Sequence, residues 1–352
     1  MLPLDKLIRK NIRQMKPYSS ARGEFTGDAS VFLDANENPY NEPYNRYPDP
    51  LQRKLKLRIA EIKGTLPEYI FLGVGSDEPI DLLMRAFCEP ALDSILTLDP
   101  TYGMYEVAAN TNNVTCKKVL LDNNFDIDID KLKAATDDTV KMIYLCSPNN
   151  PTGNLLNRNK IINILNWFQG IVVLDEAYID FVPESGFISE LEKYPNLVIL
   201  QTFSKAWGMA GLRLGMAFAS PDIIAVLNKI KYPYNINALT QKTALELISD
   251  TSNRDKWVSD LLQSREYLTA EIQKLPYVNR IYPSDANFIL VKTDDPQALY
   301  NYLTAGGIIV RNRNSISLCA GCLRITVGCA QENEVLVSAL KQYPADKCYS
   351  CN

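Results

Sequence analysis

The fold is decided by a short stretch near the middle of the chain, Ile171-Val172-Val173-Leu174-Asp175-Glu176-Ala177-Tyr178. Its first four side chains are apolar and mostly β-branched, so both faces of the segment suit a buried environment. Such a run is typical of an interior strand covered by helices on both sides. A carboxylate directly after it is costly to bury unless a cationic group meets it. From this segment alone, a functional role for Asp175 and an ordinary one, as a helix cap or an exposed acid at the rim, are equally compatible with the sequence.

Similar runs flank this strand. From about residue 69 to 230, short apolar segments alternate with longer amphipathic ones, as in parallel βαβ units. We expect strands at 69–72, 94–98, 141–146, 171–174, 197–202 and 212–219, and helices at 78–88, 158–168 and 221–229. The pattern predicts an α/β protein with a doubly wound, mostly parallel sheet.

The pattern of apolar and polar residues changes after Tyr232-Pro233-Tyr234. The remaining pattern predicts a smaller α+β unit, with helices at 238–249, 254–274, 297–305 and 331–343 and strands at 286–292, 308–311 and 323–327. A chain of 352 residues exceeds what one core serves well, so two packed domains are expected. We place an N-terminal arm and part of the small domain at 1–35, the large domain at 36–235 and the small domain at 236–352. The arm is expected to pack on the second unit or on a neighbouring subunit.

Composition excludes several classes of function. The sequence contains no histidine, which rules out Ser-His and Cys-His nucleophile pairs and every histidine-ligated metal site. Its 37 basic and 41 acidic residues give a net charge of −4, the wrong sign for attraction to nucleic acid or anionic membranes. The N-terminus does not resemble a secretory signal, and no apolar run reaches membrane-spanning length. We expect a soluble, cytoplasmic protein.

Eight cysteines are scattered along the chain. Two pairs, Cys319 with Cys322 and Cys348 with Cys351, have the spacing of a zinc site. The gap between the pairs exceeds the usual one and the second pair lies at the chain end, so buried thiols and an irregular tail are preferred to zinc. We expect no metal, and no role can be assigned to these cysteines or to Cys329.

Four segments are expected at the edge where strands end, which is where open α/β sheets bind ligands. The segment 73–78, Gly-Val-Gly-Ser-Asp-Glu, leaves a strand and enters a helix, so its free N–H groups suit a phosphate, although it could be a plain glycine turn. The segment 147–153, Ser-Pro-Asn-Asn-Pro-Thr-Gly, is a rigid loop after a buried strand or merely a turn. The third segment is the one that carries Asp175.

The fourth segment runs from Thr202 to Gly215, Thr-Phe-Ser-Lys-Ala-Trp-Gly-Met-Ala-Gly-Leu-Arg-Leu-Gly. It places Lys205 between hydroxyls and aromatic rings, with Arg213 eight residues later. Lysine is mostly a solvated surface residue, but here Phe203 and Trp207 flank it. Together the four segments supply a lysine for a Schiff base, an aspartate for a pyridinium nitrogen and a phosphate cup, which are the requirements of pyridoxal 5′-phosphate.

On these motifs, the chain resembles the fold type I, pyridoxal-phosphate-dependent aminotransferases of the aspartate aminotransferase superfamily, most closely the histidinol-phosphate aminotransferase family. The resemblance covers nearly the whole chain. Besides the four segments it includes 17–22, 34–39, 46–50, 85–90 and 321–328, which read Pro-Tyr-Ser-Ser-Ala-Arg, Asp-Ala-Asn-Glu-Asn-Pro, Arg-Tyr-Pro-Asp-Pro, Arg-Ala-Phe-Cys-Glu-Pro and Gly-Cys-Leu-Arg-Ile-Thr-Val-Gly.

The resemblance implies roles for the cofactor site. Lys205 would bond covalently to the cofactor, Asp175 would keep its ring nitrogen protonated, Tyr178 and Asn150 would bond its phenolate oxygen, and Tyr102 would stack on its ring. Catalysis would rest on the lysine, the aspartate and Tyr178. The phosphate would be bound by a set of donors that comprises the N–H groups of Ser76 and Asp77, the hydroxyls of Thr202 and Ser204, the guanidinium of Arg213, and the partner subunit's Tyr47. A homodimer is therefore expected.

The resemblance also implies a substrate. Arg324 would bind a carboxylate or phosphate, and Tyr18, Arg311 and Asn150 would surround the substrate phosphate; Tyr18 could instead anchor the arm and Arg311 could be a surface charge. The segment with Glu37 and Asn38 would shape the pocket for an imidazole. The expected reaction converts L-histidinol phosphate and 2-oxoglutarate into imidazole-acetol phosphate and L-glutamate, in histidine biosynthesis.

Other functions stay open at this point. An aromatic amino acid aminotransferase or a threonine-phosphate decarboxylase of the same superfamily would use nearly the same residues. A cofactor-binding regulator with an inactive site is a third possibility, although the lysine is present and no basic helix-turn-helix segment precedes the fold. We also expect the peptide bond between Asn150 and Pro151 to be cis, as in related enzymes.

Overall fold

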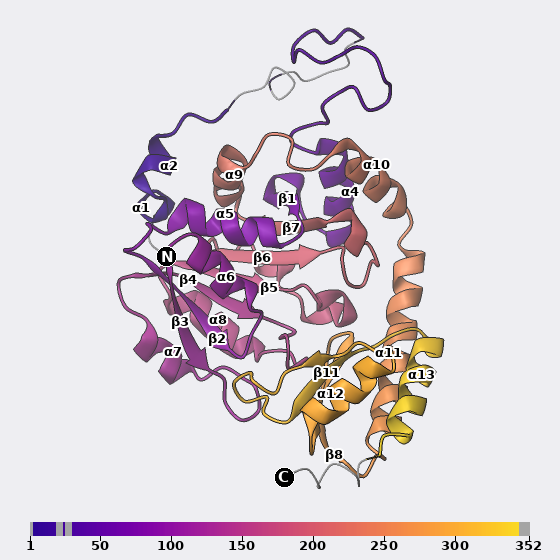
Figure 1. Cartoon of the computed structure of the whole chain (residues 1–352). Coiled ribbons are helices and arrows are strands. Elements are labelled where there is room, and N and C mark those ends of the chain that lie inside the picture. The colour runs from indigo at the N-terminus through magenta and orange to yellow at the C-terminus, as the bar shows by residue number, and fades with distance from the viewer. Residues whose placement is uncertain (1–2, 19–23, 25–29, 345–352) are drawn as a thin grey trace.

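The chain is organised around two separate sheets, seen in a computed structural model that describes residues 3–18, 24 and 30–344 (Figure 1). The strands are β1 (Ile70–Val74), β2 (Ser94–Asp99), β3 (Thr115–Leu120), β4 (Val140–Cys146), β5 (Ile171–Asp175), β6 (Leu197–Thr202), β7 (Leu214–Ala219), β8 (Val278–Tyr282), β9 (Phe288–Thr293), β10 (Arg311–Asn312) and β11 (Cys322–Thr326). The α-helices are α1 (Leu4–Leu7), α2 (Lys10–Gln14), α4 (Arg53–Lys63), α5 (Asp77–Phe87), α6 (Met104–Thr111), α7 (Ile129–Ala135), α8 (Arg158–Trp167), α9 (Pro221–Ile230), α10 (Ala238–Leu247), α11 (Ser252–Ile272), α12 (Pro296–Ala305) and α13 (Ala330–Lys341).

The larger sheet has seven strands in the order β1-β7-β6-β5-β4-β2-β3. Strands β2 to β6 pair in parallel, and β7 runs antiparallel to both of its neighbours. Only a single 3-10 turn at Ala210–Leu212 separates β6 from β7, and the connection 203–213 leaves and re-enters the sheet at the same edge, so β7 runs antiparallel to β6. The same edge therefore carries both ends of that loop. The α/β class with a doubly wound, mostly parallel sheet is confirmed.

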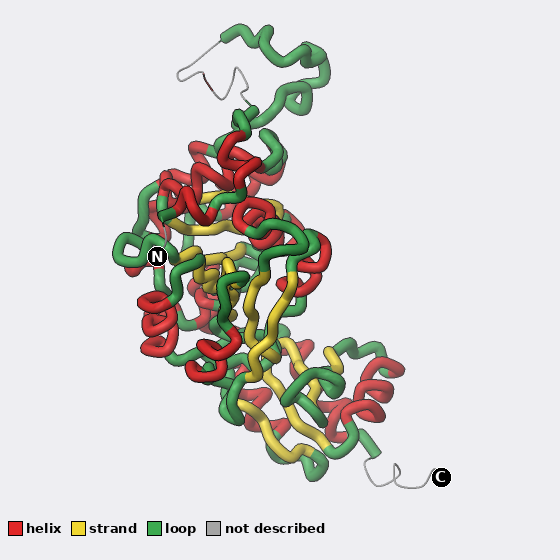
Figure 2. Tube along the Cα trace, turned by 90° about the vertical axis from the view of Figure 1, so that its left-hand side faces the viewer, coloured by secondary structure: helices red, strands yellow, loops and turns green. Residues whose placement is uncertain are grey.

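The sheet is buried on both faces because its strands are apolar on both faces. Along β5, Val172 and Leu174 pack into the cluster that contains α4, α7, α8 and α10, while Ile171 and Val173 pack into the one that contains α5, α6 and α9. This alternation follows from the two-residue period of a strand. Figure 2 shows helices flanking the strands of this sheet. Helix α8 begins where the Asn157 side chain accepts from the N–H groups of Asn159 and Lys160, a standard N-cap.

The smaller sheet is antiparallel, with the order β10-β11-β9-β8. One face packs on α11, α12 and α13, and the other continues the core of the larger unit through Phe288 and Leu290. Helix α11 joins the two units, as Figure 1 shows. A strand was predicted at 308–311, but the observed strand β10 comprises Arg311 and Asn312. The prediction is therefore wrong for residues 308–310. The central side chain of these three, Ile309, is exposed, which removes the burial that a strand face needs.

The N-terminal segment differs from its expected place. Within its described residues, α1 and α2 pack on the larger unit, with Leu7 in the cluster of α5, α6 and α9. Arg9 bonds the carboxylate of Glu89 and the carbonyl of Arg85, and Lys229 bonds the carbonyl of Arg13. Leu4, Ile8 and Ile12, from α1, the link between the helices and α2, pack against the same cluster. The domain boundaries near 35 and 235 lie outside both sheets and stay a prediction.

No helix among the described residues is long and apolar enough to cross a membrane. Of the cysteines, Cys319 and Cys322 are buried, and Cys348 and Cys351 lie outside the described residues, as does Arg22. The possibility of zinc at the four cysteines is therefore untested.

Candidate active site

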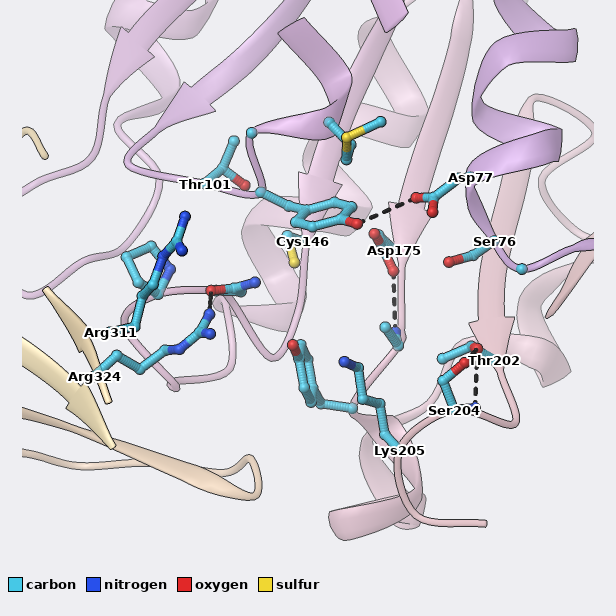
Figure 3. A pocket seen from close by; sticks show the side chains of 18 of the residues that line it. Ser76, Asp77, Thr101, Cys146, Asp175, Thr202, Ser204, Lys205, Arg311 and Arg324 are labelled. Carbon is cyan, nitrogen blue, oxygen red and sulfur yellow. Dashed lines mark hydrogen bonds between the residues drawn. The ribbon is translucent and has the colours of Figure 1, made fainter. Parts of the chain in front are cut away.

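A cavity of about 580 Å³ opens between the larger sheet and the two arginine-bearing strands of the smaller one. Its walls come from the ends of β1, β4, β5 and β6, from the start of α5 and from β10 and β11. Figure 3 shows Ser76, Asp77, Thr202 and Ser204 at one end and Arg311 and Arg324 at the other, with Asp175 and Lys205 between them. Parallel strands place their carboxyl ends on one sheet edge, so residues distant in sequence meet here.

Asp175 ends β5 inside this cavity and is only 2% exposed. Burial raises the pKa of its carboxyl to about 6, while hydrogen bonds from the Tyr105 hydroxyl at 2.6 Å and the Ala177 N–H at 3.0 Å oppose that shift. The charged form is thus costly to hold without a further cationic partner. A pyridinium N–H would supply that partner.

Lys205 lies in the loop between β6 and β7, and its ammonium is 5.6 Å from the centre of the Tyr178 ring. Burial, followed by the positive charge of Arg324, lowers the pKa of Lys205. Contacts with the rest of the domain fix the loop, because Trp207 is buried against Phe203 and donates from Nε1 to Asp180 at 3.0 Å. The lysine amine is therefore fixed at its base and more easily deprotonated than a solvated one.

The end of the cavity near Ser76 and Asp77 is a cup of hydrogen-bond donors. Asp77 opens α5 and Ser76 precedes it, so backbone N–H groups at a helix start face the cavity. Thr202 and Ser204 bond each other through their hydroxyls at 3.0 Å, and Arg213 closes the rim with its guanidinium 3.8 Å from the carboxylate of Asp77.

Two glycines make this cup possible. Gly75 has a φ of +70°, and a Cβ there would lie 2.8 Å from the Arg213 guanidinium. A Cβ on Gly215 would lie 2.2 Å from the backbone nitrogen of Ser76, so the cup loop rests directly on that glycine. The sequence thus leaves the cup open and backs it with donors and a cation, which fits the phosphate of pyridoxal phosphate.

Three further predicted cofactor residues line the same cavity. The Tyr102 hydroxyl donates to Asp77 at 3.2 Å, and its ring packs edge-on against Tyr105. Tyr178 is buried beside Phe288, and burial raises the pKa of its hydroxyl. The side-chain oxygen of Asn150 accepts a hydrogen bond from the Arg324 guanidinium. The peptide bond between Asn150 and Pro151 is cis, as predicted.

The opposite end of the cavity gathers three guanidinium groups, from Arg311, Arg313 and Arg324. Burial, followed by the charges of Arg324 and Arg311, lowers the pKa of Arg313 to about 10. The Nε atoms of Arg313 and Arg324 are buried without a hydrogen-bond partner among the described residues. No carboxylate forms an ion pair with any of the three within residues 3–18, 24 and 30–344. Such a cluster can bind an anionic group of a ligand.

Two predicted residues do not line the cavity of their own chain. Tyr18 is 73% exposed, and Tyr47 is 50% exposed and stacked on Tyr234 with ring centres 4.4 Å apart. Glu37, expected to shape the substrate pocket, instead accepts from Arg46 at 2.9 Å and from the N–H of Tyr47 at 2.6 Å. The segment from 30 to 47 extends away from the rest of the chain in Figure 1.

Sequence reasoning missed Tyr105 and Arg313. Tyr105 is buried and is the direct partner of Asp175, although the residues lie 70 positions apart. Its place three residues after Tyr102, at the start of a helix, was the available signal. Arg313 lies two residues after Arg311 near a strand pair, where alternation places both side chains on one face.

Comparisons with known proteins agree with this site. The family model of aminotransferase class I and II matches residues 22–340. The histidinol-phosphate aminotransferase of Parabacteroides distasonis is 58% identical over 341 residues, which cover 97% of this chain and 99% of that protein.

Two solved structures have the same fold. The histidinol-phosphate aminotransferase of Clostridium acetobutylicum has a TM-score of 0.78 at 28% identity, covering 85% of this chain and 90% of that one. The Sinorhizobium meliloti enzyme of the same name, solved with pyridoxal-5′-phosphate, has a TM-score of 0.76 at 23% identity, covering 84% and 82%. The chain described here therefore belongs to the aminotransferase class I and II family, whose members depend on pyridoxal phosphate.

Proposed function

We propose that this chain is a histidinol-phosphate aminotransferase that uses pyridoxal 5′-phosphate and acts in histidine biosynthesis. It would convert L-histidinol phosphate and 2-oxoglutarate into imidazole-acetol phosphate and L-glutamate. The identity of 58% to relatives of that name, over nearly their full length, supports the substrate. The cluster of arginines at one end of the cavity, which has no acidic partner in the part of the chain that the structure describes, supports an anionic substrate group.

The observation that carries the proposal is the shared cavity of Lys205, Asp175 and the donor cup. These groups come from separate segments between residues 76 and 213, and each alone has an ordinary explanation. One cavity that contains a lysine with a lowered pKa, a buried acid and a cup of hydrogen-bond donors has the parts that a pyridoxal phosphate enzyme needs.

Each residue of the cavity would have a specific task toward the cofactor. Lys205 would hold it covalently, and Asp175 would keep a proton on its ring nitrogen, an ion pair that offsets the cost of burying the carboxylate. Tyr178 and Asn150 would bond its phenolate oxygen and Tyr102 would pack on its ring. The phosphate would be bound by the N–H groups and side chains of Ser76, Asp77, Thr202, Ser204 and Arg213.

When bound, the cofactor supplies an electron sink for the carbon that carries the amino group. The chain then has to move protons. With its lowered pKa, the Lys205 amine would accept the proton from the substrate α-carbon and hold it for transfer in the next step. No histidine is needed for this step. Because the amino group is transferred in two half-reactions, the kinetics should be ping-pong.

Arg324 and Arg311 are proposed to bind the substrate phosphate and, in the second half-reaction, a carboxylate of 2-oxoglutarate, since a guanidinium fork suits both groups. Asn150 accepts from Arg324 and so orients it. Tyr18 is proposed to close the phosphate site, although in the single chain it is exposed.

We further propose a homodimer in which the partner subunit's Tyr47 completes the phosphate cup. The exposed position of Tyr47, on a segment that extends from its own chain, supports this exchange. Exposed side chains on the same segment, including Val31, Leu33, Tyr40 and Tyr44, would be covered by the partner. A cytoplasmic location remains a prediction from the sequence.

Steady-state kinetics with three amino donors would test the function. We expect L-histidinol phosphate to have a kcat/KM at least about tenfold above those of L-phenylalanine and L-threonine phosphate, because only it combines a phosphate with an imidazole. Parallel double-reciprocal plots with 2-oxoglutarate would support transamination. A preference for phenylalanine would indicate an aromatic amino acid aminotransferase, and carbon dioxide release from threonine phosphate would indicate a decarboxylase; either result would contradict the proposal.

A further inference from the structure

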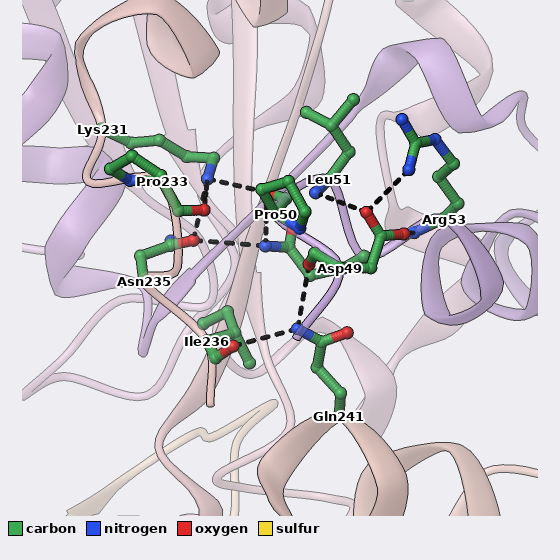
Figure 4. Close-up of polar contacts among 10 residues, drawn as sticks. Asp49, Pro50, Leu51, Arg53, Lys231, Pro233, Asn235, Ile236 and Gln241 are labelled. Carbon is green, nitrogen blue, oxygen red and sulfur yellow. Dashed lines mark hydrogen bonds and ion pairs between the residues drawn. The ribbon is translucent and has the colours of Figure 1, made fainter. Parts of the chain in front are cut away.

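A buried polar network lies behind the donor cup, away from the cavity. Its centre is Lys231, which follows α9, and its other members are Pro50, Gln52, Asn235 and Glu78. We call these five residues the junction. Figure 4 shows how Lys231 points at the carbonyl oxygens of Pro50 and Pro233 and at the side chain of Asn235. None of the five has a role in the mechanism above.

Lys231 is only 8% exposed, which is uncommon for a lysine. Its ammonium donates to the carbonyl oxygens of Pro50 at 2.8 Å, Tyr232 at 3.1 Å and Pro233 at 2.8 Å, and to the side-chain oxygen of Asn235 at 3.1 Å. Burial lowers the pKa of this ammonium to about 8, with Glu78 and Asp49 opposing the shift. All four groups around the ammonium are oxygen acceptors, and a lysine ammonium suits them because it has three N–H donors and no acceptor.

The junction reaches the donor cup through Asn235. The Asn235 amide donates to the Leu72 carbonyl at 2.9 Å and to the Glu78 carboxylate at 3.0 Å. The same carboxylate oxygen of Glu78 accepts from the N–H of Val74 at 2.6 Å. Glu78 therefore fixes the bend between the end of β1 and the start of α5, which is where the N–H groups of Ser76 and Asp77 are placed.

The junction also holds the segment that carries Tyr47. Lys231 binds the carbonyl oxygen of Pro50, and the Gln52 amide bridges that oxygen at 2.9 Å and Asn235 at 3.2 Å. Nearby, Gln241 donates to the Asp49 carbonyl at 3.1 Å. Tyr47 itself stacks on Tyr234, the residue before Asn235. One ammonium is thus bonded directly to the segment that carries Tyr47 and is linked through Asn235 and Glu78 to the cup.

We propose that Lys231 is a positioning residue for the cofactor phosphate, acting through Asn235 and Glu78 on the cup of its own subunit and through Pro50 on the segment that delivers Tyr47. This proposal rests on the proposed function, since it assumes that the cup binds the phosphate of pyridoxal phosphate. The buried lysine would raise the affinity of the protein for its cofactor. Its loss should weaken the binding of pyridoxal phosphate but not the binding of pyridoxal, which lacks the phosphate.

The experiment compares pyridoxal phosphate with pyridoxal, which lacks the phosphate. The full-length protein is stripped of cofactor, and the dissociation constants of both compounds are measured by absorbance titration for the wild type, Lys231→Met and the control Lys229→Met. Lys229 lies in the last turn of α9, two residues before Lys231, and its ammonium donates to the carbonyl of Arg13, which is not a member of the junction. We expect Lys231→Met to weaken pyridoxal phosphate binding about tenfold and to leave pyridoxal binding nearly unchanged.

An equal loss for both compounds in Lys231→Met, or no loss for either, would overturn the proposal, because a general structural role does not distinguish them. If Lys231→Met does not fold, Asn235→Ala tests the same route, since it cuts the link to Glu78 and leaves three carbonyl contacts of Lys231 in place. A preserved ratio in Asn235→Ala would then overturn it. A wild type that binds the two compounds equally would contradict the proposed cofactor site itself, a separate failure.

Discussion

The two ends of the cavity are built differently. The cup near Ser76 and Arg213 has donors from its own chain already in place, with close glycine contacts under its loop and a polar network behind it. The end with Arg311, Arg313 and Arg324 has three cations and no acidic partner within the described residues. The cup therefore has the features of a site for a ligand that stays bound, and the arginine end has those of a site for an anion that exchanges.

The two ends differ in how their charges are balanced, and this difference indicates which ligand each end binds. Cations held close together without counter-ions raise the free energy of the empty site, so they favour whichever anion enters. A cofactor that stays bound suits donors that folding has already placed, whereas a substrate that exchanges each cycle suits charges that only the ligand neutralises. The predictions below test this division.

The largest effect is expected from Lys205→Ala. The change removes the amine that holds the cofactor and moves the proton, so kcat should fall by about 10⁴-fold. The visible absorbance band of covalently held cofactor should vanish as well. Lys229→Ala, on an exposed helix face, is the matched control and should leave both readings unchanged. Substantial turnover in Lys205→Ala would show that another group carries the chemistry.

Arg313→Gln probes the substrate end. The lost guanidinium should raise KM for L-histidinol phosphate by about tenfold to a hundredfold with little change in kcat, because a charge-assisted hydrogen bond to the phosphate is lost. Turnover of unphosphorylated L-histidinol should be unaffected. Arg280→Gln serves as control, since Arg280 lies over the Tyr282 ring and does not line the cavity. Equal losses for both substrates would mean that Arg313 supports the fold and does not read the phosphate.

Mixed dimers test whether the cup is completed by a second chain. Tyr47→Ala alone should weaken pyridoxal phosphate binding by about tenfold. In a dimer of one Lys205→Ala and one Tyr47→Ala subunit, one site carries both changes and the other carries neither, if Tyr47 acts across the interface. Half of the sites should then regain normal affinity and turnover. Activity no higher than that of the separate variants would place Tyr47 in the site of its own chain.

Tyr105→Phe should give the smallest effect, on pH dependence. Burial raises the pKa of Asp175 to about 6, and the hydrogen bond from Tyr105 lowers it, so losing the bond should raise that pKa further. Only the ionised carboxylate can pair with a protonated ring, so the acid limb of the kcat/KM profile should move to higher pH, by about one unit. Tyr144→Phe, a buried neighbour that donates to the Ile80 carbonyl, should leave the limb in place. An unshifted limb in Tyr105→Phe would remove Tyr105 from the account.

Much of the larger sheet could be predicted because its interior strands are apolar on both faces. The strands at 140–146, 171–175 and 197–202 lie within one or two residues of their predicted bounds. Strands β3 and β8 were not predicted, since each lies at a sheet edge and carries polar or exposed side chains that weaken the pattern. Propensity cannot find a strand whose outer face is solvated.

The candidate site divides in the same way. Lys205, Asp175 and Arg213 could be predicted because their local motifs resemble those of a known family, and the structure brings them to one cavity. Tyr105 and Lys231 could not, because their partners Asp175 and Pro50 are distant in sequence and only the fold reveals the contacts. The roles proposed for Tyr18 and Tyr47 are not visible in a single chain, since neither residue lines the cavity of its own chain.

The most direct test of the central claim is to reduce the holoenzyme with borohydride and map the modified peptide by mass spectrometry. Reduction fixes the cofactor to the amine that holds it. We expect one pyridoxyl group per chain, on Lys205, in the peptide that also contains Ala206 and Trp207. A pyridoxyl group on another lysine, or none, would contradict it.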